Sequence, residues 1–215
     1  MTLLSITAVR KLLGGRWALD GVNVVWDQPG TLVVFGENGA GKSTLLRVVG
    51  GILQADEGEV TIAGHRLITA RVAALRHVGY APEAADLPPH LGVGELVSLV
   101  ASLKRCDRPP ASLIDRLGVG SLLLKRFGAL SLGQRRRAGL LAALVGDPDL
   151  LLLDEPTNGL DADGIDTIAE LLRERAAAGR AALCATHDRA FIDRVAAATV
   201  EIRAGRARFP APTRD

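Results

Sequence analysis

The first third of the chain alternates short apolar stretches with glycine-containing turns, a pattern typical of β-strands. Three strands are predicted by these apolar stretches, over residues 3–9, 22–26 and 31–35. Turn signals stand between the first two strands, at Gly14-Gly15 and Asp20-Gly21. The chain is therefore expected to begin with an antiparallel β region.

A glycine-rich loop follows the third strand and leads into a helix predicted over residues 43–49, which Gly50-Gly51 ends. Two further β-rich stretches, 59–62 and 65–68, flank Ala63-Gly64. A short polar-free turn between two such stretches predicts a hairpin.

The pattern changes after Tyr80, where prolines separate segments with helical period. The clearest helical segments are residues 94–104 and 112–117. We interpret residues 84–130 as a helical insertion that divides the core of the domain into residues 1–83 and 131–215.

From residue 140 onward, strands and helices alternate. Strands are predicted over residues 150–153 and 181–185, and helices over residues 162–178 and 189–196. This alternation predicts a parallel sheet with crossover helices. Residues 206–215, which include two prolines, are predicted to form an irregular tail.

The composition is that of a globular protein, since 48% of the 215 residues are hydrophobic. A formal net charge of +2 predicts no general attraction to nucleic acid or to an anionic membrane, and an aromatic content of 3% argues against base-stacking surfaces. Cys106 and Cys184 lack metal-ligand spacing, so two free thiols are expected. The sequence shows neither a signal-peptide pattern nor an apolar run near the roughly 20 residues that span a bilayer. Work at a membrane would then require a second chain to cross it.

The glycine-rich loop matches G-x-x-x-x-G-K-[ST] and lies between a predicted strand and a predicted helix, as a phosphate-binding loop must. Its residues are Gly36, Glu37, Asn38, Gly39, Ala40, Gly41, Lys42, Ser43 and Thr44. Tight turns at the glycines let consecutive backbone N–H groups point at phosphates, and the helix adds the positive end of its dipole. We expect Lys42 to reach the β- and γ-phosphates and Ser43 to give its hydroxyl to Mg²⁺. The spacing favours a nucleotide site over a structural turn.

Two acids end the apolar strand at residues 150–153, and ligands gather at the carboxyl ends of central parallel strands. Asp154 is the expected partner of Mg²⁺, through water. Glu155 points elsewhere and would hold and polarise the attacking water. A solvated strand end is the alternative, which the preceding leucines and the P-loop disfavour. His187 follows the strand at 181–185; a lone histidine there is more often structural, but beside a P-loop a contact with the γ-phosphate is favoured.

The segment Leu130-Ser131-Leu132-Gly133-Gln134-Arg135-Arg136-Arg137 resembles the signature motif of ABC ATPases, with Leu132 where that family often has Gly. Five further features stand in the family's order along nearly the whole chain: the P-loop, Gly79-Tyr80-Ala81-Pro82, Asp154-Glu155-Pro156-Thr157, Asn158-Gly159-Leu160-Asp161 and His187-Asp188. The resemblance implies an α/β fold of the P-loop NTPase, ABC ATPase type. That fold has a mixed or parallel sheet core, an N-terminal antiparallel β region and an inserted α-helical subdomain, here as a single domain over residues 1–215.

The resemblance also implies Mg²⁺-dependent hydrolysis of ATP sandwiched between two such domains. Ser131, Gly133 and Gln134, at a helix N-terminus, would face the γ-phosphate that the P-loop of the second domain binds. Asp161 corresponds to the acid that couples the two sites across the interface. Because one chain carries half of each site, hydrolysis requires a dimer, and a homodimer is expected.

Two positions depart from the family. Glu83 stands where the family has Gln after Tyr-x-Pro; its carboxylate still ligates Mg²⁺ through oxygen, but it donates no hydrogen bond and adds negative charge near phosphate. We expect altered or slower turnover, or a changed link between nucleotide state and the helical insertion. Leu13 stands at the place of the aromatic residue that stacks on adenine, which predicts looser base selectivity. Trp17 could substitute, but a packing role is favoured for it.

Three functions fit these features. The favoured one is a peripheral subunit on the cytoplasmic face of the inner or plasma membrane, which energises a transporter through its permease subunits. The lack of a C-terminal regulatory extension resembles export-type subunits, and the length resembles the small ATPase of the haem-export/cytochrome c maturation system. One alternative is a soluble ABC ATPase acting on ribosomes or DNA, although such proteins usually carry two cassettes or a coiled-coil arm. The other is a non-catalytic nucleotide-binding module, against which Glu155 argues.

The run Arg135–Arg137 bears on these alternatives. Alone, it would fit a nucleic-acid patch. A helix beside triphosphate is the favoured explanation, so no nucleic-acid partner is expected.

Overall fold

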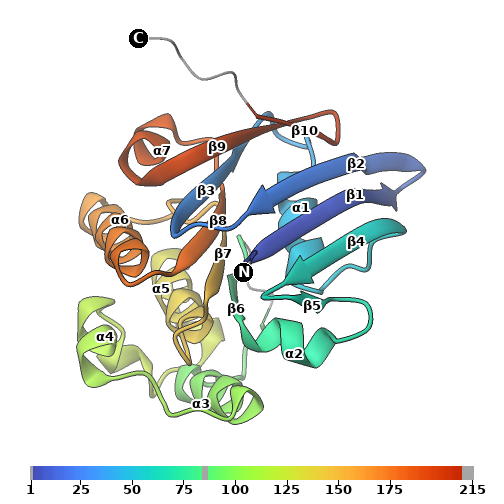
Figure 1. Ribbon diagram of the computed structural model, residues 1–215. Coiled ribbons are helices and arrows are strands. Elements are labelled where there is room, and N and C mark those ends of the chain that lie inside the picture. The colour runs from blue at the N-terminus through green and yellow to red at the C-terminus, as the bar shows by residue number, and fades with distance from the viewer. Residues whose placement is uncertain (1, 84–86, 210–215) are drawn as a thin grey trace.

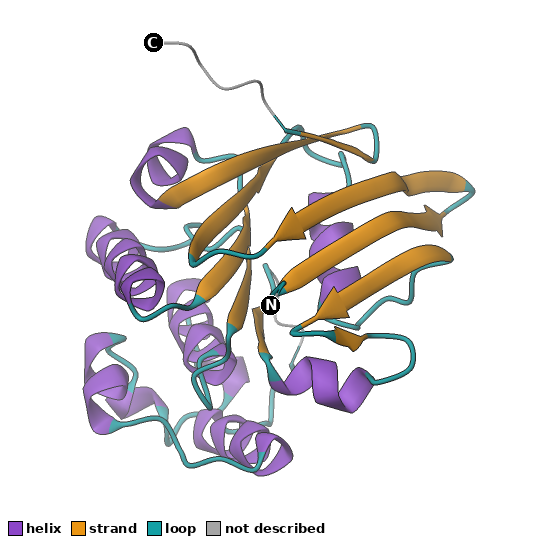
Figure 2. Ribbon diagram, in the orientation of Figure 1, coloured by secondary structure: helices purple, strands orange, loops and turns teal. Residues whose placement is uncertain are grey.

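A computed structural model describes residues 2–83 and 87–209. The described chain forms two sheets with helices between and around them (Figures 1 and 2). The smaller sheet is antiparallel, in the order β2 (Arg16–Trp26), β1 (Leu4–Leu13), β4 (Glu57–Ile62) and β5 (His65–Arg66). The larger sheet has the order β10 (Arg206–Arg208), β9 (Ala196–Arg203), β3 (Gly30–Phe35), β8 (Ala181–Ala185), β7 (Leu150–Asp154) and β6 (Val78–Ala81). All neighbours in it are parallel except β10 and β9, so the predicted mixed sheet is confirmed.

Seven α-helices accompany the sheets in the described chain. They are α1 (Lys42–Val49), α2 (Arg71–Arg76), α3 (Val93–Lys104), α4 (Ala111–Arg116), α5 (Leu132–Ala143), α6 (Ala162–Ala177) and α7 (Arg189–Val195). Two short 3₁₀ turns lie between α4 and α5, at Gly120–Leu122 and Phe127–Ala129. Helix α1 lies between the two sheets, whereas α5, α6 and α7 lie on the other face of the larger sheet (Figure 1).

The central strands of the larger sheet, β3, β8 and β7, are buried on both faces, and the apolar side chains of these strands alternate between two cores. Leu150 and Leu152 of β7 pack with α1 and the smaller sheet, whereas Leu151 and Leu153 pack with α5 and α6. Strand β3 alternates in the same way. This explains why its strands read as continuous apolar runs and not as alternating ones.

Several predicted boundaries need correction. Asp20-Gly21 is not a turn but lies within β2, where the pairing with β1 is irregular; the hairpin turn is at Gly14-Gly15. The stretch predicted to end the last helix, around Ala196, instead opens strand β9, which lies parallel to β3. Alanines carry no strand signal of their own, so the partner strand decides this conformation.

Strand β10 occupies the start of the predicted irregular tail, and residues 210–215 of that tail lie outside the described residues. The predicted helical segments at 94–104 and 112–117 are α3 and α4 with small shifts of boundary. The first residues of the predicted insertion, 84–86, are also outside the described residues. Helix α2 was missed by the sequence pattern.

The two-sided burial of β7 gives a testable expectation. Leu152→Ala removes a fully buried side chain between α1 and the sheet, so it should lower the free energy of unfolding by about 2–5 kcal/mol. Leu103→Ala, at a residue that is 71% exposed on α3, is the matched control and should change it by well under about 1 kcal/mol. Urea unfolding of both variants measures the difference; equal stabilities would contradict the packing described.

Candidate nucleotide site

The register of the parallel strands brings four chain segments to one edge of the larger sheet. Val34 of β3 pairs with Ala185 of β8, and Ala185 pairs with Asp154 of β7. Ala81 of β6 pairs with Leu153 in the next strand. The residues that follow these strands therefore emerge side by side: the P-loop, Glu155, Thr186 with His187, and Pro82 with Glu83. Such an edge is where ligands bind in open α/β sheets.

The P-loop wraps around the beginning of α1. Gly41 has a φ of 112°, and a Cβ on it would lie 2.3 Å from the carbonyl oxygen of Ala18, so only glycine fits there. The Lys42 side chain is buried, and its Nζ donates to the carbonyl oxygens of Gly36 (2.9 Å) and Glu37 (3.2 Å). Both acceptors are neutral carbonyl oxygens, and an ammonium group binds an anion more strongly than a carbonyl. An anion inside the loop would therefore be the stronger partner of Lys42.

Ser43 and Asp154 form the part of the site that suits a divalent cation. The Ser43 hydroxyl donates to Oδ1 of Asp154 at 2.9 Å, while Oδ2 of Asp154 is buried and has no hydrogen-bond partner among the described residues. Burial raises the pKa of Asp154, the Ser43 bond lowers it, and Glu83 raises it again through charge repulsion. Mg²⁺ prefers hard oxygen ligands, and the carboxylate oxygen Oδ2 of Asp154 and the hydroxyl of Ser43 are two such ligands side by side. Phosphate and water would complete the coordination shell of the ion.

Glu155 is buried, and both of its carboxylate oxygens are engaged. The Thr186 hydroxyl donates to Oε2 at 3.1 Å, and Nδ1 of His187 lies 3.0 Å from Oε1. Its backbone has a φ of 46°, an uncommon left-handed conformation for a residue with a side chain. His187 itself is 59% exposed, so the histidine lies between the buried carboxylate and the open side of the site.

Glu83 is exposed and lies on the same side of the sheet. Its Oε1 accepts a hydrogen bond of 3.0 Å from Nδ2 of Asn158, in the loop after β7. The structure thus connects the segment after β6 with the segment after β7 through two side chains. In the sequence, Asn158 is only the first residue of the motif Asn158-Gly159-Leu160-Asp161. Its contact with Glu83 depends on the fold.

These groups surround one cavity of about 430 Å³. Its lining comprises Ala18, Asn38, Gly39, Gly41, Lys42, Ser43, Thr44, Glu83, Glu155, Asn158 and His187. Most residues predicted from separate motifs therefore meet in one place, and Asp154 lies directly behind Ser43. The lining supplies backbone N–H groups and the Lys42 ammonium for a phosphate chain, together with the carboxylates of Glu83 and Glu155.

The signature residues do not line this cavity; they form the beginning of α5. Ser131 caps the helix, since its hydroxyl accepts from the backbone N–H of Gln134 at 3.3 Å while Oε1 of Gln134 accepts from the N–H of Ser131 at 3.1 Å. A Cβ on Gly133 would lie 2.8 Å from the carbonyl oxygen of Gly159, so glycine allows α5 to approach the loop after β7. Asp161 caps α6 in the same way, through the N–H of Gly164 at 3.0 Å.

Comparison with known proteins places this arrangement. Residues 19–158 match the family model "ABC transporter". The cytochrome c biogenesis ATP-binding export protein CcmA of Chelativorans sp. (strain BNC1) is 36% identical over 175 residues, covering 81% of this chain and 86% of that protein. The uncharacterised ABC transporter ATP-binding protein YdbJ of Bacillus subtilis (strain 168) is 33% identical over 188 residues, covering 86% of this chain and 61% of that protein. The chain belongs to the ABC transporter family.

Solved structures agree. One described as the structure of the ATP-binding subunit of an ABC transporter superposes with a TM-score of 0.88 and 26% identity over 97% of this chain and 90% of that chain. The resemblance stated from the motifs is therefore confirmed, and the chain is an ABC-type ATPase domain. It spans 61% of the Bacillus protein and 63% of the glycine betaine uptake protein YehX of Escherichia coli (strain K12). Among the described residues, no helix has the length and apolar character to cross a bilayer.

Leu13 and Trp17 are the residues that the resemblance places near a nucleotide base. Leu13 ends β1 and is 41% exposed, and Trp17 near the start of β2 is 39% exposed. The Arg10 guanidinium lies 4.1 Å from the centre of the Trp17 ring, a cation–π contact. Neither side chain lines the phosphate cavity; from the β1–β2 hairpin, Ala18 lines it. The expectation of looser base selectivity remains a prediction.

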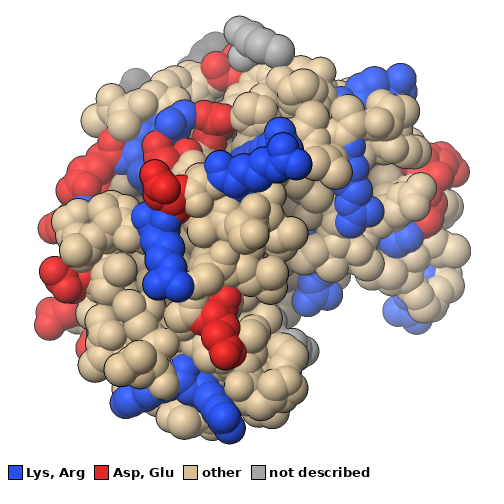
Figure 3. Space-filling model, turned by 90° about the horizontal axis from the view of Figure 1, so that it is seen from below, with Lys and Arg blue, Asp and Glu red and all other residues tan. Residues whose placement is uncertain are grey.

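The three consecutive arginines do not form one surface. Arg135 is exposed, Arg136 is half-buried against the loops at the site, and Nη2 of Arg137 lies 3.4 Å from both carboxylate oxygens of Asp161. Figure 3 shows that the face seen from below mixes charges of both signs over a mostly uncharged surface. Sequence reasoning missed Arg136 and Thr186 as site residues because both act on neighbours that only the sheet register brings close.

The P-loop geometry predicts the behaviour of one variant. Lys42→Ala removes the cation that faces the loop interior, and losing a charge-assisted bond of about 1.5–3 kcal/mol should weaken ATP binding roughly 10- to 100-fold. Lys125→Ala, at an exposed lysine before the second 3₁₀ turn, is the control and should bind as wild type. Equilibrium titration with a fluorescent ATP analogue measures both, and undiminished affinity in Lys42→Ala would refute this role for the loop.

Proposed function

We propose that this ATPase domain hydrolyses ATP with Mg²⁺ and energises a membrane transporter, as a peripheral subunit on the cytoplasmic face of the membrane. The observation that carries the catalytic part is the carboxylate of Glu155, buried at the edge of the P-loop cavity with His187 at 3.0 Å. The names of two relatives support the transporter part, since CcmA is named an ATP-binding export protein and YehX an ATP-binding protein of an uptake system.

The residues divide the chemistry among them. Lys42 would exchange its contacts with Gly36 and Glu37 for the β- and γ-phosphates, which it binds as a cation. Ser43 and Asp154 would hold Mg²⁺, with Glu83 as a further oxygen donor once its bond to Asn158 opens. When bound, the ion would neutralise charge that develops on the phosphates.

Glu155 would accept a proton from the water that attacks the γ-phosphate, because its carboxylate is buried beside the cavity and its oxygens accept hydrogen bonds. His187 would keep Glu155 oriented through Nδ1 and donate to the γ-phosphate from its exposed edge. Thr186 would fix the second carboxylate oxygen. General-base catalysis of this kind contributes about 10²–10⁴-fold to a rate.

The same proposal includes a second copy of the domain. Ser131, Gly133 and Gln134 form a well-capped helix start that lies outside this chain's own cavity. The capping box uses the N–H groups of Ser131 and Gln134, so the donors proposed for phosphate bound elsewhere are the N–H of Gly133 and the hydroxyl proton of Ser131. Asp161 stands beside them at the start of α6. Solved cassettes described as dimeric share this fold, with a TM-score of 0.82 for one of 21% identity. A homodimer that closes on two ATP molecules accounts for these residues.

For the direction of transport we propose export. The support is the CcmA relative, which is named an export protein and of which this chain covers 86%. Uptake and import proteins are among the relatives as well. The direction of transport is therefore a property of the membrane partner.

One substitution separates the proposed base from a merely structural acid. Glu155→Gln keeps the shape of the side chain but loses its basicity, so ATP should still bind while turnover falls by at least about 100-fold. ATP should also trap a stable dimer, seen by size-exclusion chromatography with light scattering. Glu170→Gln, an exposed acid on α6, is the matched control with unchanged turnover. Hydrolysis at the wild-type rate in Glu155→Gln would overturn the assignment.

A second experiment tests the transporter. A tagged chain purified from detergent-solubilised membranes should carry a stoichiometric polytopic membrane protein with it. Under the proposal this chain supplies the nucleotide site, and the partner supplies the part that crosses the membrane. Recovery with ribosomes or nucleic acid, and without such a protein, would favour the soluble alternative. In inside-out vesicles that hold the purified complex, ATP-dependent accumulation of the substrate supports export, and ATP-dependent depletion contradicts it.

A further inference from the structure

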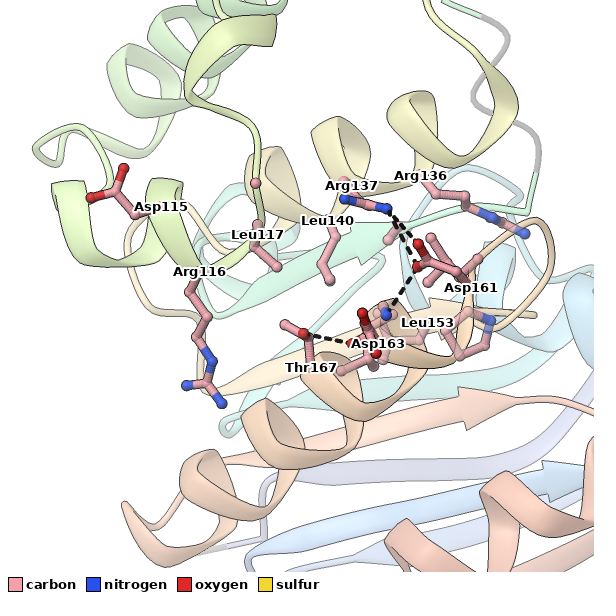
Figure 4. A pocket seen from close by; sticks show the side chains of 16 residues that line it. Asp115, Arg116, Leu117, Arg136, Arg137, Leu140, Leu153, Asp161, Asp163 and Thr167 are labelled. Carbon is pink, nitrogen blue, oxygen red and sulfur yellow. Dashed lines mark hydrogen bonds and ion pairs between the residues drawn. The ribbon is translucent and has the colours of Figure 1, made fainter.

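The guanidinium of Arg136 lies between the two loops that carry the acids of the site. Its Nη1 donates to the carbonyl oxygen of Pro82 at 2.6 Å, and its Nη2 donates to that of Glu155 at 2.8 Å. Longer bonds of 3.3 and 3.4 Å reach the carbonyl oxygens of Asn158 and Asp154. Figure 4 shows Arg136 and Arg137 leaving the same helix α5, with Arg137 joined to Asp161. One side chain thus ties α5 to the segments that follow β6 and β7.

The bonds of Arg136 are unusual for a charged group because all of them go to main-chain oxygens. Among the described residues it forms no ion pair. Burial lowers the pKa of Arg136, and the nearby charges of Glu83, Asp154 and Glu155 oppose this lowering in part. A half-buried cation costs desolvation energy, which nearby negative charge offsets. The carboxylate oxygens remain with other partners, so Arg136 fixes the loops without occupying the groups that would meet metal or water.

The backbone of Glu155 needs such support. Its φ of 46° is a left-handed conformation that a residue with a Cβ adopts at a cost, and it persists only where the surroundings determine it. Three hydrogen bonds hold the backbone of Glu155. Its N–H donates to the carbonyl oxygen of Ala185 at 2.8 Å, and its carbonyl accepts from the backbone N–H of Asn158 at 3.2 Å and from Nη2 of Arg136 at 2.8 Å. The first bond comes from the sheet, the second closes the turn after β7, and the bond from Arg136 is the one that links this backbone to α5.

Helix α5 is also the helix whose first turn carries Ser131 and Gly133. Arg136 follows within the next turn, so a shift of α5 moves the guanidinium and the carbonyls that it binds. We propose that Arg136 is a positioning residue for hydrolysis, which sets the backbone of Glu155 according to the position of α5. This rests on the proposed function, because it assigns the base to Glu155 and the start of α5 to the second domain.

The test compares turnover with binding. Arg136→Gln should lower kcat at least tenfold while the Kd of a non-hydrolysable ATP analogue changes less than about twofold, because Arg136 lies outside the phosphate cavity. It should also reduce the Hill coefficient for ATP, since the base no longer follows α5. Arg136→Lys keeps the charge and part of the bonds, so it should restore a part of kcat; it also serves where the glutamine variant unfolds.

Arg173→Gln, at an exposed arginine of α6, is the matched control, and its kinetics should be those of wild type. Wild-type kcat and Hill coefficient in Arg136→Gln would overturn the proposal. So would a parallel loss of kcat and analogue affinity, with a lowered unfolding midpoint and no recovery in Arg136→Lys, because that pattern describes a purely structural contact. An active Glu155→Gln would instead refute the assignment of the base, whatever Arg136 does, so the two failures are distinguishable.

Discussion

The structure depends on the parallel pairing of β6, β7, β8 and β3, four buried strands that end at the same edge of one sheet. Each strand contributes a different part to the site: the P-loop follows β3, the two acids end or follow β7, Thr186 and His187 follow β8, and Pro82 and Glu83 follow β6. Because a parallel sheet is buried on both faces, these strands cannot shift along one another without misplacing two cores at once. The precision of the site is therefore a consequence of apolar packing far from the chemistry.

The positions that depend on local rules were predictable from the sequence. Glycines, Lys42 and Ser43 at fixed spacing predict a phosphate-binding loop, since backbone geometry and charge act within a few residues. Four leucines before Asp154 determine a central strand. The start of strand β9 was not predicted, because its first residues are alanines, which have no strand preference. The conformation of this segment comes from its pairing with β3. The residues of the separate motifs line one cavity because of the order of the strands in the sheet. No single motif carries information about that order.

What the sequence left open are the interactions between those motifs. Arg136 reads as one of three arginines, and nothing in its neighbours along the chain distinguishes it from Arg135 or Arg137. The fold separates them, because on a helix consecutive residues point in different directions. Arg135 reaches solvent, Arg136 reaches the loops after β6 and β7, and Arg137 reaches Asp161. The helical period of α5, set against those loops by Gly133, decides the role of each.

The charge balance of the site explains how this chain tolerates Glu83. With Asp154 and Glu155 it makes three carboxylates at one site. Burial raises the pKa of Asp154 above its ordinary value, and the charges of Glu83 and Glu155 add to this effect, although the bond from Ser43 opposes it. Lys42 lies on the P-loop side of the cavity, and Arg136 lies beneath the loops on the acid side without neutralising any of the acids directly. Asn158 adds a neutral donor that holds Glu83. Among the described residues, Ser43 holds one oxygen of Asp154 and Asn158 holds one oxygen of Glu83, which leaves the second oxygen of each carboxylate to a metal ion. Both oxygens of Glu155 lie against Thr186 and His187, and Arg136 restrains only the backbone that carries this acid.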